Sequence, residues 1–503
     1  MSANSSQLDV RPVDRGLPAQ ASNKPMEASL PISAAVKSTR TRAATTPLTA
    51  NASSVNLPLA FMLTGLTALA IGVIWLVVNP PVLATYHYNQ FTVAATHLFV
   101  LGWICSIVMG AMYQLVPVAL ETKLYSERIA KAQFLCHGIG FAGMVWMFKS
   151  WNMKQVGHFG SVMALGVILF VYNIARTLLK APKWNVTASA ITAALAWLSL
   201  TITMGLFVVA GKCFSEMLEA APASGPFSGV EHVVKSMGEF MQRFDAISAM
   251  HAHAHLGGIG FFTMLIVGVS YKLIPMFTLS EIQNRRRAGW SVALLNIGLA
   301  GSFVTILRRS PWKLAFALVV IAALALYGLE LAAILRARKR RVMDWGIKTF
   351  LTAVAMLLPL SALAIVLSWP GLPLNALTGQ LENLYGFLGL IAVISFALIG
   401  MLYKIIPFLV WYGVYSKKTG FHKVPALADL YSEPLQIAGY FAFLSGVATL
   451  SLGILATNAL AIRIGGMLLA GSLGTLLLNV AHMLAHFFRP KTQPLAASIP
   501  AQP

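Results

Sequence analysis

The chain has 503 residues, of which 57% are hydrophobic and only 11% are charged. This composition excludes an ordinary soluble domain and indicates a protein that crosses a membrane many times. The net charge of +21 does not indicate a nucleic-acid partner, because the basic residues neither form one domain nor accompany a platform of stacking aromatic side chains.

Residues 1–54 are rich in Ser, Ala, Thr and Pro and contain no apolar run of the kind that a cleavable signal peptide requires. We expect a disordered cytoplasmic tail here, and a short C-terminal tail at 492–503. The three cysteines, Cys105, Cys136 and Cys213, are too few and too widely spaced for a disulfide framework or a Cys-based zinc site.

Twelve hydrophobic runs lie between residues 55 and 491, and each is long enough to cross a lipid bilayer as a helix. Because lipid offers the backbone no hydrogen-bonding partner, we expect all of them to be helical. The chain is therefore predicted to be an all-α integral membrane protein. The runs lie near 55–79, 91–118, 131–149, 157–179, 187–210, 246–277, 288–307, 314–335, 347–369, 384–412, 435–456 and 464–488.

Most Lys and Arg residues fall in the tails and in alternate connections between these runs. Such an asymmetry orients helical membrane proteins, with the basic segments inside. It predicts a multi-pass membrane protein with both termini in the cytoplasm. The basic runs 285–287 and 338–341 are then orientation and headgroup anchors.

One helix pattern occurs three times, on spans two, six and ten. Each copy ends in a proline, with a tyrosine four residues before it, and the position twenty residues before the proline is His97, His255 or Phe387. Internal symmetry of this kind is common in membrane folds. It predicts three quasi-repeats of four helices, at about 55–180, 187–341 and 346–491.

The sixth span contains three histidines in five residues. His251 and His255 are four residues apart and share one helix face, whereas His253 points roughly the opposite way. Imidazole is a good ligand for haem iron, copper or zinc. We expect His97 and His255, which share a repeat position, to hold one haem b between them near the outer face. His253 would serve a second haem or a metal such as copper, and His251 a metal.

Other histidines have more than one interpretation. His87 and His158 are expected in the headgroup zone, bonded to water or backbone, and His251 has the same alternative. His482 and His486, four residues apart, would form a second metal site or a proton relay, or simply an interfacial pair. His137 is expected to be a core histidine with its hydrogen bonds satisfied.

The segment AlaHisAlaHisLeuGlyGlyIleGlyPhePhe, followed by GlyValSerTyrLysLeuIlePro, resembles the His-x-His helix of the haem-copper oxidase superfamily, especially C-type oxidases and nitric oxide reductases. This resemblance implies the twelve-helix fold of the oxidase catalytic subunit I. In that family one His-x-His binds a low-spin and a high-spin haem. His97 is similar to the family's span-two haem ligand, and His255 occupies the repeat position of a copper ligand.

Two departures from the family pattern imply an incomplete ligand set, with an incomplete copper site and without the usual haem ligands of span ten. Span seven, AlaGlyTrpSerValAlaLeuLeuAsnIleGlyLeu, lacks the adjacent histidine pair that supplies copper ligands, and span ten has Tyr385 and Phe387 where the family has its His-x-His. This partial set resembles the NnrS-type membrane haem proteins associated with nitric oxide stress.

The resulting hypothesis, which rests on this resemblance, is a respiratory haem protein in the lipid bilayer of a bacterial inner membrane that transfers electrons or handles O2 or NO. A cytochrome c or a quinol would donate the electrons, and small accessory subunits would accompany the chain. If it is an enzyme, it is an oxidoreductase similar to cytochrome oxidase or nitric oxide reductase. The alternatives are a non-catalytic haem, copper or nitric-oxide-response factor and a secondary transporter.

Overall fold

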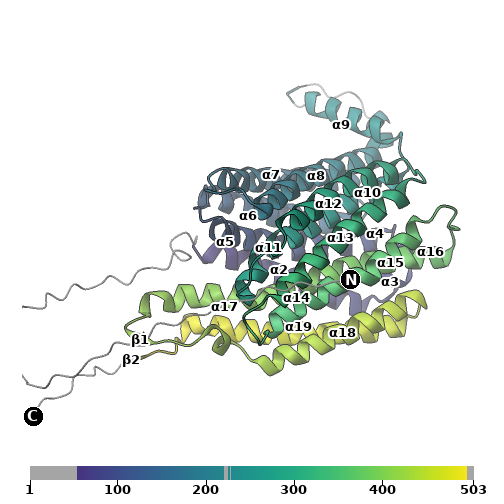
Figure 1. Cartoon of the computed structure of the whole chain (residues 1–503). Helices are drawn as coiled ribbons and strands as arrows, with labels where there is room; N and C mark the ends of the chain where they lie inside the picture. The colour runs from purple at the N-terminus through teal and green to yellow at the C-terminus, as the bar shows by residue number, and fades with distance from the viewer. Residues whose placement is uncertain (1–53, 220–224, 227, 495–503) are drawn as a thin grey trace, which may run out of the picture. The chain divides into compact units, whose positions relative to one another are not determined.

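The computed structural model describes residues 54–219, 225–226 and 228–494, and this part of the chain is almost entirely helical (Figure 1). The tail predicted at 1–54 lies outside the described residues except for Ser54, and residues 495–503 of the predicted C-terminal tail lie outside them too. The all-α prediction is confirmed.

Three successive units of helices follow one another along the chain. The first comprises α2 (Asn56–Val78), α3 (Pro81–Ala84), α4 (Gln90–His97), η1 (Leu98–Cys105), α5 (Ser106–Ala119), α6 (Glu127–Lys149) and α7 (Met153–Leu178). The second comprises α8 (Val186–Glu219), α9 (Ser228–Met241), α10 (Ala246–His255), η2 (Leu256–Thr263), α11 (Met264–Thr278), α12 (Arg285–Leu307) and α13 (Lys313–Arg336).

The third unit repeats the plan with its first helix broken in two. It comprises α14 (Trp345–Ala355), α15 (Leu357–Ser368), α16 (Ala376–Phe387), η3 (Leu388–Ser395), α17 (Phe396–Tyr415), α18 (Glu433–Leu455) and α19 (Ala459–Phe488). Between α17 and α18 lie two 3-10 turns, η4 (Ser416–Lys418) and η5 (Leu427–Leu430), and β1 (His422–Lys423), which pairs antiparallel with β2 (Gln493–Pro494).

Eleven helical segments of the described residues are long and apolar enough to cross a membrane. The twelfth predicted span corresponds to α6, which has 23 residues. Its buried Gln133 and His137 make it less apolar than the others. The prediction of twelve membrane-spanning helices is therefore confirmed approximately, and α6 is the least apolar of the twelve.

The second helix of each unit has the same three-part construction, and we call it the repeat helix. It begins at a side-chain cap, Asn89, Asp245 or Asn375, whose oxygen accepts backbone N–H bonds. After His97, His255 or Phe387 it widens into an eight-residue π-helix, η1, η2 or η3. Such wide turns are rare and gather at functional sites. Their recurrence at one repeat position supports the predicted three-fold plan.

A glycine in each repeat helix brings it into close contact with the first helix of its unit. These glycines, thirteen residues after the start of the pattern, are Gly110, Gly268 and Gly400. A Cβ atom on Gly268 would lie 2.3 Å from the Cβ of Ala190 in α8. Proline lacks a backbone N–H and tends to end or kink a helix. α5 and α11 end within three residues of Pro117 and Pro275, but α17 continues well beyond Pro407.

The third and fourth helices of each unit are joined by one buried polar residue. Asn173 exchanges two hydrogen bonds with the backbone of Ser126, and Asn479 does the same with Ser432. Glu330 takes the equivalent position in the second unit and accepts N–H bonds from the turn before α12. The three units thus share side-chain bonding as well as helix order.

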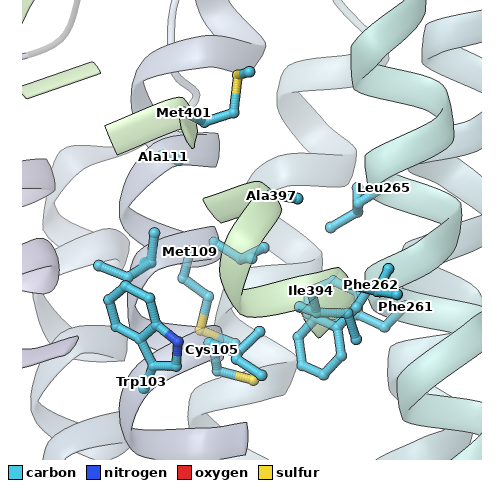
Figure 2. Close-up of a cluster of buried hydrophobic side chains, with 14 of the residues drawn as sticks. Trp103, Cys105, Met109, Ala111, Phe261, Phe262, Leu265, Ile394, Ala397 and Met401 are labelled. Atoms are coloured by element: carbon cyan, nitrogen blue, oxygen red, sulfur yellow. The ribbon is translucent and has the colours of Figure 1, made fainter. Parts of the chain in front are cut away.

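The units close into a ring, because α7 packs on α8, α13 on α15 and α19 on α2. Inside the ring, η3 contacts both η1 and η2. Figure 2 shows buried side chains of the three repeat helices meeting there, among them Trp103, Phe261 and Ile394. The indole N–H of Trp103 also donates a hydrogen bond to Ser395 Oγ over 2.9 Å. The core therefore holds the three repeat helices in a fixed relation.

Candidate haem site

A cavity of about 1350 Å³ lies among the three units. It is lined by the first turns of the repeat helices, so we call this side of the bundle the N-cap end. Most of its walls are apolar side chains, as is typical of sites for small molecules and cofactors. The polar side chains that line it include His87, His97, His251, His253, His255 and Tyr385.

His97 and His253 face each other across this cavity. Their ring centroids are 6.5 Å apart and the ring planes lie within 15° of parallel. Two imidazoles that bind one metal ion through bonds of about 2.0 Å would have their centroids ~6 Å apart. The observed separation therefore fits a single metal centre held from both sides, with His97 supplied by the first unit and His253 by the second.

Hydrogen bonds fix which nitrogen of each ring is free. His97 Nδ1 lies 2.8 Å from the carbonyl oxygen of Val93, and His253 Nδ1 lies 3.0 Å from that of Thr201. A carbonyl oxygen only accepts, so Nδ1 carries the proton in both rings and donates it. Nε2 of each neutral ring then presents a lone pair. Outer hydrogen bonds of this kind orient metal-bound histidines in proteins.

His255 does not pair with His97, and the prediction that it does is wrong in this respect. Its ring instead stacks against Tyr385 of α16, with centroids 5.7 Å apart and planes within 20° of parallel. His255 Nε2 lies 3.4 Å from the Tyr385 hydroxyl, and its Nδ1 donates to the carbonyl oxygen of His251 over 2.8 Å. His255 thus faces the third unit, whereas His253 faces the first.

The two pairs are equivalent under the three-fold plan. In each pair, one residue stands at the first position of the pattern in its own unit. Its partner lies two residues before the first position of the pattern in the next unit. This rule relates His97 to His253 and His255 to Tyr385. At the third interface the same positions are Phe387 and Ala95, which carry no ligand atom. One interface therefore offers two imidazoles and the next offers one.

Glycines leave open space beside these rings. A Cβ atom on Gly258 would meet nothing within 4 Å, and one on Gly257 would meet only Thr201 at 3.4 Å. Both residues line the cavity, so a flat ligand could lie against the backbone there. Gly260, by contrast, packs against Trp197 of α8.

The donor set and the space fit a haem. His97 and His253 would bind the iron, and glycine backbone and apolar side chains would contact the porphyrin. Lys212, Arg309 and Lys313 also line the cavity and could pair with the two carboxylate groups of a haem.

His251 and His87 meet at the same end of the bundle. His87, in the segment before α4, was expected in the headgroup zone but is partly buried, with its Nε2 2.9 Å from Nε2 of His251. Burial lowers the pKa of His87, so the ring is neutral at neutral pH. Glu382 of α16 lies nearby, 4.0 Å from His87 Nε2. Sequence reasoning overlooked Glu382, because it lies two residues before the predicted span 384–412, whereas the helix of the structure begins at Ala376 and includes it.

The remaining histidines lie elsewhere. His486 is buried with its Nδ1 2.6 Å from the Tyr415 hydroxyl, whereas His482 is exposed, so the two have different surroundings. His137 is fully buried, as expected of a core histidine, and its Nε2 lies 2.9 Å from Ser106 Oγ. Its Nδ1 has no hydrogen-bond partner of good geometry, so the expected satisfaction holds for one ring nitrogen only. His158 is exposed on α7.

Comparisons with known proteins agree with this architecture. Residues 41–153 match the family model of cytochrome c and quinol oxidase polypeptide I. The fold is similar to that of a heme-copper terminal oxidase dimer solved by cryo-EM, with a TM-score of 0.56 and 11% sequence identity over 89% of this chain and 84% of that one. No curated protein matches the sequence.

Proposed function

We propose that this chain, a membrane protein with the haem-copper oxidase subunit I-like fold, holds one haem b between His97 and His253 and serves electron transfer. The observation that carries the proposal is the facing pair of imidazoles, 6.5 Å apart and within 15° of parallel. Both rings present a lone pair at Nε2, and they line a cavity large enough for the cofactor.

When bound, the haem would supply reversible one-electron chemistry, with a potential set by its axial ligands and its burial. The chain's own residues do the positioning. The carbonyl groups of Val93 and Thr201 hold the two rings in orientation and keep Nε2 free of a proton. The apolar lining of the cavity excludes water, which favours a stable potential.

His255 is the proposed ligand of a second haem, at the interface with the third unit. Its Nε2 faces the cavity opposite Tyr385, so the second interface offers one imidazole where the first offers two. A haem held there by one protein ligand would supply the binding of a small gas molecule. This asymmetry supports O2 or NO as the substrate class, with His255 on the reactive side and His97 and His253 on the electron-transfer side.

The proposed setting is a bacterial inner membrane, with the N-cap end toward the periplasm and both termini in the cytoplasm. The bias of Lys and Arg toward the other end supports this orientation. A cytochrome c or a quinol would deliver electrons, and small accessory subunits would assist the exchange. The copper ion of a complete oxidase would lack its usual ligands on the helix after the second repeat helix, because α12 contains no histidine.

The visible spectrum and the haem content of the detergent-purified protein test the proposal. We expect a reduced haem b spectrum in the wild type, and loss of at least one haem per chain in His97→Ala and in His253→Ala. His255→Ala should retain the spectrum of the first haem and lose only the second. His158→Ala, which replaces an exposed histidine on α7, is the matched control. Full haem content in His253→Ala would refute the assignment.

Consumption of O2 or NO with an artificial electron donor then separates an enzyme from a haem-containing response factor. Turnover that is lost in His255→Ala while the first haem persists would support the reactive role of the second interface. A haem-loaded protein without turnover would make the chain a non-catalytic factor. If the protein contains no haem after expression with added haem precursor, the result would favour the transporter hypothesis instead.

A further inference from the structure

The nitrogen atoms of His87 and His251 approach each other without a spacer. Nε2 of one lies 2.9 Å from Nε2 of the other, and the rings are stacked with centroids 5.1 Å apart. Two ligands of one tetrahedral metal ion, each bound at about 2.0–2.1 Å, are separated by ~3.3 Å. A small rotation of either ring would therefore place both nitrogen atoms on one ion.

The orientation of His87 is fixed by the amide of Asn383. The Asn383 amide nitrogen donates to the carbonyl oxygen of Thr85 over 2.8 Å and to Oε1 of Gln380 over 2.9 Å. Its Oδ1 must therefore be the atom that faces His87 Nδ1, at 3.1 Å. Nδ1 of His87 is then the protonated nitrogen, and Nε2 presents its lone pair toward His251. This is the outer hydrogen bond that a metal-binding histidine ordinarily has.

A carboxylate completes the group. Glu382 Oε2 lies 4.0 Å from His87 Nε2, and the three side chains offer ligand atoms that all lie within 4.8 Å of one another. Among the described residues this is the one such group of three His, Cys, Asp or Glu side chains. All three are partly buried, so their polar atoms are only partly solvated. A hydrogen bond joins the two Nε2 atoms here, and His251 donates it because His87 Nε2 carries the lone pair. A metal ion would take the place of that proton, since metal-bound nitrogen atoms are deprotonated.

The surrounding groups carry charges of both signs. The cationic Lys313 interacts electrostatically with both Glu382 and His251, and the anionic Asp245 also acts on His251. Arg309 in turn acts on Lys313 and Asp245, and Lys212 interacts with Asp245. The neighbourhood thus holds two carboxylates and three cationic side chains, so a bound divalent cation would depend on its direct bond to the Glu382 carboxylate for charge compensation.

We propose that His87, His251 and Glu382 bind one divalent first-row transition metal ion at the N-cap end. Each unit contributes one ligand, so the ion would join all three units at a point beside the haem cavity. Two imidazoles and a carboxylate favour Cu2+, Zn2+ or Fe2+ over Mg2+ or Ca2+. The site is separate from the haem ligands, although the carbonyl oxygen of His251 accepts the Nδ1 hydrogen bond of His255.

The experiment uses the purified full-length protein after removal of weakly bound metal with a chelator. Cu2+, Zn2+ and Fe2+ are added one at a time, the last without oxygen, and binding is measured by calorimetry and by elemental analysis. We expect one equivalent of at least one of these ions beyond the haem iron. His87→Ala and the isosteric Glu382→Gln should each weaken that binding at least tenfold, by the magnitude usual for disturbed metal sites.

Asn383→Leu tests the orienting role, because it leaves all three ligands in place. It should weaken metal binding by roughly 10–100-fold, and His158→Ala should leave binding unchanged. For the Cu2+ form, electron paramagnetic resonance should show coupling to imidazole nitrogen that is altered in His87→Ala. The haem spectrum of each variant reports on folding and is expected to match the wild type.

The outcomes are distinct from those of the haem proposal. If His97→Ala loses haem but still binds the metal ion, the haem site and the metal site are independent of each other. The metal site would be refuted if His87→Ala and Glu382→Gln both bound the ion with unchanged affinity. It would also be refuted if the wild type bound none of the three ions beyond the haem iron. Both conclusions hold whatever the haem content is.

Discussion

Gly205 of α8 lies directly against the imidazole of His253. A Cβ atom on Gly205 would stand 3.0 Å from the Cε1 atom of that ring, closer than side chains ordinarily pack. The hydrogen bond from Nδ1 to the carbonyl oxygen of Thr201, one turn earlier on the same helix, holds the ring against this glycine. A glycine on one helix thus makes room for the proposed haem ligand of another.

Gly205→Val should displace the His253 ring and lower haem content, because the branched side chain cannot share the space. We expect a loss of at least half of the first haem, measured from the reduced spectrum per mole of protein. The control is Gly289→Val, since a Cβ at Gly289 meets nothing within 4 Å. If Gly205→Val keeps full haem and an unshifted spectrum, His253 is not the ligand.

The sequence predicted the helices and the repeat well, because both depend on local patterns. Apolar runs of about twenty residues locate helices in lipid. The shared spacing from His97, His255 and Phe387 to a proline identified the repeat helix. The π-helix that follows each of these positions has no comparable signature, since η1, η2 and η3 differ in nearly every residue.

The pairing of His97 could not be derived from the repeat. Equal positions in two units suggest equal depth, which was the basis for pairing His97 with His255. In a closed ring, however, equivalent positions face equivalent neighbours rather than each other. His97 therefore faces the second unit at His253, and His255 faces the third unit at Tyr385. The approach of His87 to Glu382 is equally invisible in sequence, because 295 positions separate them.

Gly268→Ala should destabilise the protein, whereas an alanine at Gly328 should not. The new Cβ at Gly268 would lie 2.3 Å from that of Ala190, and inserting an extra carbon into a packed core costs about 1–3 kcal/mol. Gly328 has nothing within 4 Å, so alanine there should gain about 0.5–1 kcal/mol from helix propensity. Thermal unfolding in detergent measures both. Equal effects at the two positions would contradict the close contact of α8 and α11.

Glu330→Ala should be among the most destabilising substitutions on the side of the bundle opposite the cavity. Glu330 is fully buried and accepts four bonds, from the backbone of Gln283 and Asn284 and from two nitrogens of Arg287 at 2.7 Å each. Removing one partner of a buried ion pair costs about 3–5 kcal/mol. Because Arg287 is partly exposed, we expect the lower part of that range.

Glu330→Gln keeps an acceptor oxygen and should cost less than Glu330→Ala, so the pair of variants separates charge from hydrogen bonding. Glu239→Ala, at an exposed position of α9, is the control. Unfolding temperatures that are the same for Glu330→Ala and Glu239→Ala would show that the buried carboxylate does not hold α12 and α13 together.

Asp245 should give the helix that carries the three histidines a stability that depends on pH. Its Oδ2 accepts the backbone N–H and the hydroxyl of Ser248, each at 2.9 Å. The backbone bond above all lowers the pKa of Asp245 below its value in the unfolded chain. The stabilisation is therefore present above the unfolded pKa of about 3.9 and is lost as the pH falls through the pKa of the folded protein.

Asparagine caps a helix about as well as aspartate but does not titrate. The melting temperature of the wild type should exceed that of Asp245→Asn near neutral pH, and the difference should shrink below about pH 4. A difference that stays constant over this range would show that the cap does not depend on charge.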